Sequence, residues 1–161
     1  MLAIKRLLTL LLVFAIPVLT WSAYSANGHT GLIEAENLAE DARQGRPIIL
    51  LVSQDHCPFC VQIKREVLKP LIKSGEFSEE ILIRELFIDL GTEVTDFQGK
   101  RRPSADLAQD YGADLTPTLL FLGPGGEELS ERIIGINTLD LFVLYVDSAI
   151  KESIAALVQR R

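Results

Sequence analysis

The chain has 161 residues, of which 48% are apolar, and its formal net charge is −6. This length suits one domain with its own core, and the apolar fraction is too high for a chain that stays disordered. An acidic balance without a large basic cluster argues against a nucleic-acid-binding protein, so we expect no nucleic-acid partner.

The first 25 residues have the three-part pattern of an export signal: two basic residues, an apolar run at 7–18 and then small residues. We expect residues 1–25 to be a signal peptide that is cleaved ahead of Ala26. The alternative is an uncleaved N-terminal membrane anchor, since the apolar run with its flank approaches the length that spans a bilayer. Either interpretation places residues 26–161 outside the cytoplasm as one domain, in the periplasm or another extracytoplasmic space, soluble after cleavage or anchored.

Apolar periodicity and turn residues predict alternating helices and strands in the rest of the chain. In chain order, the predicted elements are a linker at 26–30, helix 32–43, strand 48–52, a helix from Cys57 that bends or stops near Pro70, strand 84–90, an irregular stretch at 91–103, helix 104–111 with Ser104 as its N-cap, strand 118–122, a turn at 123–126, strand 132–136 and a last helix capped by Thr138. Strands separated by helices favour parallel pairing, whereas the Gly-rich turn favours an antiparallel hairpin. The predicted fold class is therefore α/β, with a mixed central sheet and helices on both faces.

Cys57 and Cys60 are the only two cysteines, and they lie where strand 48–52 leads into a helix. The first thiol would lie beside unpaired backbone N–H groups at the positive end of the helix dipole, which favours the thiolate that attacks disulfides. Cys57 is therefore the predicted nucleophile, and Cys60, one turn on, the predicted resolving thiol. Because such a small loop contributes little chain-entropy stabilisation, redox chemistry explains the pair better than structural stapling.

Metal binding is the main alternative for the two cysteines. A closed zinc site needs about four ligands. Beyond the cysteines, the chain offers only His29, in the predicted linker, and His56 as histidine ligands. We therefore predict no metal site.

Three neighbours of the cysteines are predicted to affect the site. Protonated His56 would stabilise the Cys57 thiolate and make the disulfide more oxidising; the alternative is a surface histidine without strong coupling. Pro58 removes one backbone N–H that would otherwise be available to the sulfur. Phe59 is either an exposed apolar contact for a partner or part of the core.

The chain resembles the thioredoxin superfamily over nearly everything after the export segment. The resemblance is carried by strand 48–52, the Cys57-Pro58-Phe59-Cys60 helix start, the Thr116-Pro117-Thr118 step before a strand, and Gly135 at the end of the last strand. It implies a thioredoxin-like fold in which Pro117 is cis and faces the cysteines. It also implies that the backbone of Thr116 pairs with an extended substrate chain. Together with Phe59 as an exposed apolar contact, Thr116 and Pro117 are the predicted substrate-binding residues. Statistics of X–Pro bonds alone would favour a trans peptide.

Within the superfamily, the chain is most similar to small exported thioredoxin-related proteins, through the insertion at 91–103 and the run at 116–121. A proline directly after the first cysteine, here Pro58, is a feature in which the chain resembles glutaredoxins and periplasmic disulfide oxidases. Two departures stand out. Leu51 takes the place of the buried aspartate of cytoplasmic thioredoxins, and the chain has no room for the large helical insertion of the oxidases.

The resemblance implies an exported protein thiol–disulfide oxidoreductase whose redox group is the Cys57–Cys60 disulfide, with no diffusible cofactor. Its partners would be cysteine-containing exported proteins and a membrane protein that transfers electrons. The missing insertion favours reduction of protein disulfides over their donation. Two alternatives stay open: a periplasmic disulfide oxidase, and a non-catalytic thioredoxin-like module that binds partners or senses redox state.

Overall fold

The computed structural model describes residues 32–136 and 138–160, so the predicted export segment at 1–25 and linker at 26–30 lie outside the described residues. The described elements in chain order are α1 (Leu38–Ala42), β1 (Ile48–Ser53), α2 (Pro58–Ile63), the π-helical turn η1 (Lys64–Leu68), α3 (Lys69–Ser74), β2 (Leu82–Phe87), β3 (Glu93–Thr95), β4 (Arg101–Pro103), α4 (Ser104–Asp110), β5 (Thr118–Leu122), β6 (Ile133–Ile134) and α5 (Leu139–Gln159). No helix in these two ranges is both long and apolar enough to cross a membrane.

Four strands form the central sheet in the order β2-β1-β5-β6, and β3 and β4 form a separate two-stranded sheet. β1 pairs with β2 in parallel, as expected for strands joined through a helix. β5 and β6 pair antiparallel after the Gly-rich turn, also as expected. The parallel pattern ends at β5, which runs antiparallel to β1. The predicted mixed sheet is confirmed.

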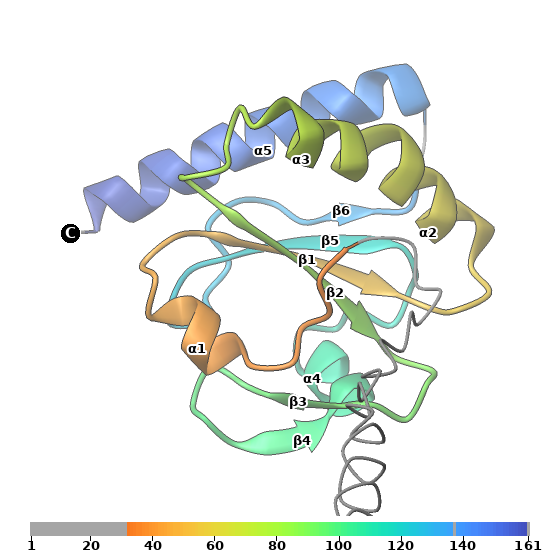
Figure 1. Ribbon diagram of the computed structural model, residues 1–161, viewed down its shortest axis with the longest axis vertical. Coiled ribbons are helices and arrows are strands. Elements are labelled where there is room, and N and C mark those ends of the chain that lie inside the picture. The colour runs from red at the N-terminus through yellow and green to blue at the C-terminus, as the bar shows by residue number, and fades with distance from the viewer. Residues whose placement is uncertain (1–31, 137, 161) are drawn as a thin grey trace, which may run out of the picture.

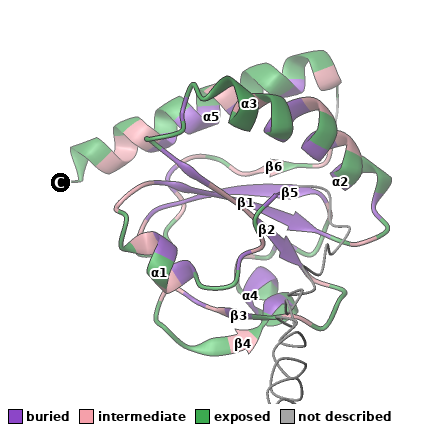
Figure 2. Ribbon diagram, in the orientation of Figure 1, coloured by how far each residue is buried: buried purple, intermediate pink, exposed green. Residues whose placement is uncertain are grey.

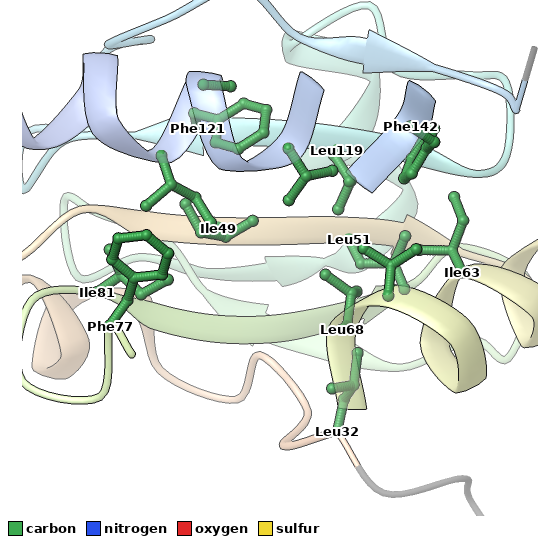
Figure 3. Packing of buried hydrophobic residues seen from close by; sticks show 14 residues of the cluster. Leu32, Ile49, Leu51, Ile63, Leu68, Phe77, Ile81, Leu119, Phe121 and Phe142 are labelled. Carbon is green, nitrogen blue, oxygen red and sulfur yellow. The ribbon is translucent and has the colours of Figure 1, made fainter. Parts of the chain in front are cut away.

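Helices cover both faces of this sheet, as predicted (Figure 1). All six residues of β1 are buried, as expected for a central strand covered on both sides. On one face, Ile49 and Leu51 pack with side chains of α2, η1 and α5, including Phe142 (Figure 3). On the other face, Ile48 and Leu50 belong to a second core cluster with residues of α1, α4 and β3. The purple interior of the sheet in Figure 2 separates these two helical layers.

The predicted helix at 32–43 is wrong in its first half. Its start is extended, because the N–H of Ala35 donates to the carbonyl of Glu85 (2.8 Å) and the N–H of Glu85 donates to the carbonyl of Ile33 (2.9 Å). α1 begins only after Asn37, whose side chain accepts a hydrogen bond from the N–H of Glu40. Pairing with the edge of β2 therefore overrides the helical pattern here.

The stretch predicted to be irregular, 91–103, contains the β3–β4 hairpin, in which Val94 is opposite Arg102. The prediction of Ser104 as an N-cap is also wrong, because Pro103 takes that position and Ser104 is the first helical residue. Thr138 does precede α5, but its side chain makes no capping hydrogen bond. The strand predicted at 84–90 begins two residues earlier and ends three residues earlier, at 82–87, and the strand predicted at 132–136 is shorter, at 133–134.

The redox helix runs through α2, η1 and α3 and continues past Pro70. The N–H of Lys69 donates to the carbonyl of Lys64, an i→i+5 bond that widens the turn just before the proline. The prediction that the helix bends or stops near Pro70 is wrong as to a stop: the helix has a π-helical turn just before the proline and ends at Ser74, with Gly75 as its C-cap in the left-handed conformation, φ 71°.

Candidate redox site

Cys57 is the N-cap of α2, in an extended backbone conformation, and Pro58 opens the helix. The two cysteines form a disulfide with a Cα–Cα distance of 5.2 Å. The N–H of Cys60 points at Cys57 Sγ, at a donor–acceptor distance of 3.1 Å. The predicted placement of the first sulfur beside a free N–H at a helix start is confirmed.

Both cysteines are buried, but not equally. Residue Cys57 keeps 8% of its surface exposed, and residue Cys60 keeps none. The division into an attacking Cys57 and a resolving Cys60 stays a prediction.

The Thr116–Pro117 peptide is cis, as the family resemblance implied. Pro117 is buried, and beside it lies a groove of about 320 Å³. The groove is lined by Phe59, Leu115, Thr116, Pro117, Ile134, Gly135 and Ile136. Phe59 is 58% exposed, so it is a surface contact and not part of the core. The structure thus brings together the three residues predicted to bind substrate.

Hydrogen bonds fix the loops around this groove. Thr116 Oγ1 donates to Gln54 Oε1 (2.8 Å), which ties the cis-proline loop to the segment before the cysteines. The N–H of Gly135 donates to the carbonyl of Pro117 (2.8 Å). Gly135 has φ 69°, a conformation that favours glycine over other residues. The groove therefore has a preformed shape.

The two residues predicted to modulate the cysteines, His56 and Pro58, lie on the surface beside them. His56 is almost fully exposed, and its Nδ1 lies 3.0 Å from Asp55 Oδ2. The N–H of Asp55 in turn donates to the carboxylate of Asp89 (3.1 Å), which joins the loops after β1 and β2. Pro58 is exposed at the first helical position. The effect of His56 and Pro58 on the sulfur stays a prediction.

A buried ion pair lies one turn beyond the cysteines and was not foreseen. Lys64 Nζ is 2.6 Å from Glu85 Oε1, with side chains only 5% and 1% exposed. Glu85 is the register partner of Leu51, the position that carries the aspartate in cytoplasmic thioredoxins. Lys64 Nζ also lies 5.3 Å from the ring centroid of Phe87. The signal in the sequence was an acid within a strand otherwise rich in apolar residues.

Leu115, Ile134 and Ile136 were also missed as groove residues, although each is next to a residue that the family resemblance singled out. Within residues 32–136 and 138–160, no group of three or more His, Cys, Asp or Glu side chains converges in a way that could hold a metal. The predicted absence of a metal stays a prediction, and His29 lies outside the described residues.

A family model described as "Thioredoxin-like domain" matches residues 34–150. The chain belongs to this family. Membership and the Cys57–Cys60 pair together support thiol–disulfide exchange as the general chemistry of this thioredoxin-like protein. A comparison with curated proteins finds none that matches.

Solved structures share the fold at low sequence identity. Mitochondrial thioredoxin 3 from Saccharomyces cerevisiae has 18% identity and a TM-score of 0.52, over 75% of this chain and 94% of that one. A structure described as "DsbH Oxidoreductase" has 19% identity and a TM-score of 0.52, over 75% and 86%. Thioredoxin O2 from Arabidopsis thaliana has 17% identity and a TM-score of 0.50, over 74% and 91%. At these identities, the likeness establishes the thioredoxin-like fold and nothing about substrate.

Proposed function

We propose that this thioredoxin-like protein is an exported thiol–disulfide oxidoreductase that reduces disulfides in cysteine-containing exported proteins. The observation that carries the proposal is the Cys57–Cys60 pair at the start of α2, in which residue Cys57 is 8% exposed and residue Cys60 is 0% exposed. A structural staple would not need this asymmetry, whereas a two-step exchange does.

In the proposed reaction, the Cys57 thiolate of the reduced protein attacks a substrate disulfide and forms a mixed disulfide, and one substrate thiolate leaves. The N–H of Cys60 and the start of the helix stabilise the negative charge on Cys57. The Cys60 thiolate then attacks Cys57 Sγ and releases the second substrate thiol. The protein loses two electrons and ends as the disulfide, with no diffusible cofactor.

The groove beside Pro117 is the proposed binding surface for the substrate chain. Phe59 and Pro117 supply apolar contacts, and Thr116 offers its backbone to an extended chain. These residues come from the redox helix and from the loop before β5, so a chain lying in the groove would pass close to the cysteines. The preformed loops lower the ordering cost of binding.

Export rests on the pattern at residues 1–25, with two basic residues ahead of an apolar run. An exported reductase has no access to cytoplasmic reductants, so it requires a membrane protein that delivers electrons. Reduction is favoured over oxidation because the chain lacks the helical insertion of the periplasmic oxidases.

The reduction potential of the Cys57–Cys60 pair tests the direction of transfer. The full chain is equilibrated with glutathione or dithiothreitol buffers, and free thiols are trapped and counted. A potential near that of thioredoxin, about −270 mV, is the expected result for a reductase. A potential of about −120 mV, near that of the strongest oxidants, would mean that the protein donates disulfides. If the cysteines did not interconvert between dithiol and disulfide, only the alternative of a non-catalytic binding or sensing module would remain.

A further inference from the structure

The loops around the redox groove lie at one edge of the central sheet. β1 and β2 are parallel, so the loops that follow these strands begin at the same edge (Figure 1). β5 runs antiparallel to β1, with Thr118 opposite Val52, so the loop that precedes β5 lies at this edge too. The three loops therefore meet at the end of β1, where Cys57 opens the redox helix.

Each of these loops carries an aspartate. Asp114 lies two residues before Thr116, which lines the groove. Asp55 follows Gln54, whose Oε1 accepts a hydrogen bond from Thr116 Oγ1 (2.8 Å). The carboxylate of Asp89 accepts a hydrogen bond from the N–H of Asp55 (3.1 Å). The three aspartates, called the aspartate rim below, are thus tied to the loops that form the groove.

The negative charge of the aspartate rim is not balanced by the described residues. Within residues 32–136 and 138–160, neither Asp89 nor Asp114 forms an ion pair with a Lys or Arg. Asp55 lies 3.0 Å from the exposed His56, which is charged only when it is protonated. The three loops, at 54–57, 88–92 and 113–117, contain no Lys or Arg.

Basic residues that lie close to these loops or to the groove in the sequence are already paired with other acids. Lys64 pairs with Glu85, Arg84 with Asp41, and Arg132 with Glu128. The groove itself is lined by apolar and uncharged residues. A partner at the redox site therefore meets an uncharged groove beside an acidic rim whose counter-charge the partner can supply.

This arrangement indicates the charge of the partner. A protein segment with Lys or Arg beside its reacting cysteine matches the rim, whereas an acidic segment is repelled by it. Each exposed ion pair contributes little to affinity, but complementary charge raises the rate of encounter and excludes wrong partners. We therefore expect the rim to act on the rate of exchange with charged substrates.

We propose that the redox site selects protein substrates whose disulfide lies in a basic segment. The substrate chain covers the groove beside Pro117, and its Lys or Arg side chains face Asp55, Asp89 and Asp114. The inference rests on the proposed thiol–disulfide exchange and adds the charge of the substrate to it.

Two synthetic peptides serve as probes. Each has one central cysteine in a disulfide with 2-mercaptoethanol, an uncharged leaving group; one has two lysines on either side of the cysteine, the other two glutamates. The Cys57 thiolate attacks the peptide sulfur, and the mercaptoethanol thiolate leaves. The Cys60 thiolate then attacks Cys57 Sγ and releases the peptide thiol, so the protein loses the two electrons that the probe disulfide gains. Trapping of the peptide thiol at set times gives the rates.

The flanking charges also change the reactivity of the probes themselves. Both peptides are therefore reduced with dithiothreitol, an uncharged small thiol, and each protein rate is divided by the dithiothreitol rate for the same peptide. The ratio of the two corrected rates, lysine peptide over glutamate peptide, is the charge preference of the protein.

The wild-type chain should show a charge preference of about tenfold at low ionic strength. The preference should fall toward one at about 1 M salt, where the screening length is only 3 Å. The variant Asp89→Asn, Asp114→Asn should lower the preference about threefold, because it removes two of the three rim charges and leaves Asp55 in place. The matched control is Glu79→Gln, Glu80→Gln, which removes two exposed carboxylates before β2, at the opposite end of that strand, and should keep the preference.

A wild-type chain without a charge preference, or with one that salt does not reduce, overturns the proposal. So does a folded Asp89→Asn, Asp114→Asn variant that keeps the wild-type preference, or a control that lowers it as much, because net charge alone would then explain it. If the double variant does not fold, Asp114→Asn alone applies the same test with a smaller change. A wild-type chain that reduces neither peptide and does not react with glutathione disulfide refutes the proposed function itself, which is a distinguishable result.

Discussion

The start of α2 and the π-helical turn η1 belong to one continuous helix, yet their surroundings are opposite. At the start of α2, the apolar side chain of Phe59 is exposed. One turn beyond Cys60, the charged side chain of Lys64 is buried and paired with Glu85. An apolar side chain thus lies outside and a charged one lies inside, the reverse of the usual distribution.

The contrast between these two regions shows which side chains have their partners within the chain. The buried charge of Lys64 has its counter-charge on the neighbouring strand, so this region needs no other molecule. The exposed apolar side chain of Phe59 has no comparable cover among the described residues, and it lies two positions after Cys57, the predicted nucleophile. We therefore expect changes at the start of α2 to affect exchange, and changes at η1 to affect stability.

The largest expected effect is on exchange. Cys57→Ala should reduce the rate of reaction with glutathione disulfide to the uncatalysed background, because the predicted attacking thiolate is lost. The free energy of unfolding of the reduced chain should change by less than about 1 kcal/mol, since the removed group is one sulfur at the surface end of the core. Thiol-exchange kinetics and urea unfolding under reducing conditions measure the two quantities. If Cys57→Ala still exchanged disulfides at the wild-type rate, Cys57 would not be the nucleophile.

At η1, we expect a large effect on stability. Lys64→Met leaves the Glu85 carboxylate buried without its counter-charge and should lower the free energy of unfolding by about 3–5 kcal/mol. The double change Lys64→Met, Glu85→Leu should recover most of that loss, because both charges are removed. The control is Lys151→Met, which breaks the exposed pair with Asp147 and should cost about 0.5 kcal/mol. Urea unfolding measures the free energy of unfolding of each variant. If Lys64→Met lowered it by no more than Lys151→Met does, the predicted importance of the buried pair would be wrong.

A smaller effect on stability should appear at high pH, on the other face of the sheet. Burial, with help from nearby carboxylates such as Glu128, raises the pKa of Tyr111 from 10.0 to about 12. Its hydroxyl donates to the carbonyl of Gly126 (2.7 Å). Because the folded pKa exceeds the unfolded one, this contribution is complete below pH 10 and is lost as the pH rises through about 12. The wild-type chain should lose about 1 kcal/mol more than Tyr111→Phe over this range, after allowance for solvent screening.

Urea unfolding of both chains on either side of that pH range provides the measurement. A Tyr111→Phe variant with the same pH dependence as the wild-type chain would show that another group titrates. Exchange through Cys57 should respond to its own thiol and not to Tyr111, which keeps this test separate from the redox site.

The smallest expected effect is at His56. If its protonated form stabilises the Cys57 thiolate, His56→Ala should make the potential of the pair more negative, by less than about 30 mV because the ring is exposed and close to Asp55. His56→Gln serves as a polar control that also lacks the charge and should give the same shift. A shift to a more positive potential would contradict the predicted role.

The strands of the central sheet and the redox motif could be predicted from the sequence because their signals are local. Five consecutive apolar residues mark β1, and the two cysteines follow it at the spacing of one helical turn. The cis peptide before Pro117 came from the family resemblance, since nothing in the local sequence distinguishes it from a trans bond.

Features that depend on pairing across the chain were missed. The extended segment at 32–37 takes its conformation from hydrogen bonds to Glu85, roughly 50 residues away, and no helical periodicity reports on such a bond. Lys64 and Glu85 are 21 positions apart, and only the packing of η1 against β2 brings them together. The β3–β4 hairpin was hidden because both of its strands are three residues long and largely polar.

The central claim is that Cys57 attacks and Cys60 resolves, and a Cys60→Ser variant tests it most directly. The variant is incubated with glutathione disulfide, and the product is mapped by mass spectrometry. The account predicts a stable glutathione adduct on Cys57 that accumulates because no second thiol can release it, while the wild-type chain passes on to the Cys57–Cys60 disulfide. Absence of an adduct on Cys57, together with unchanged exchange kinetics, would contradict it.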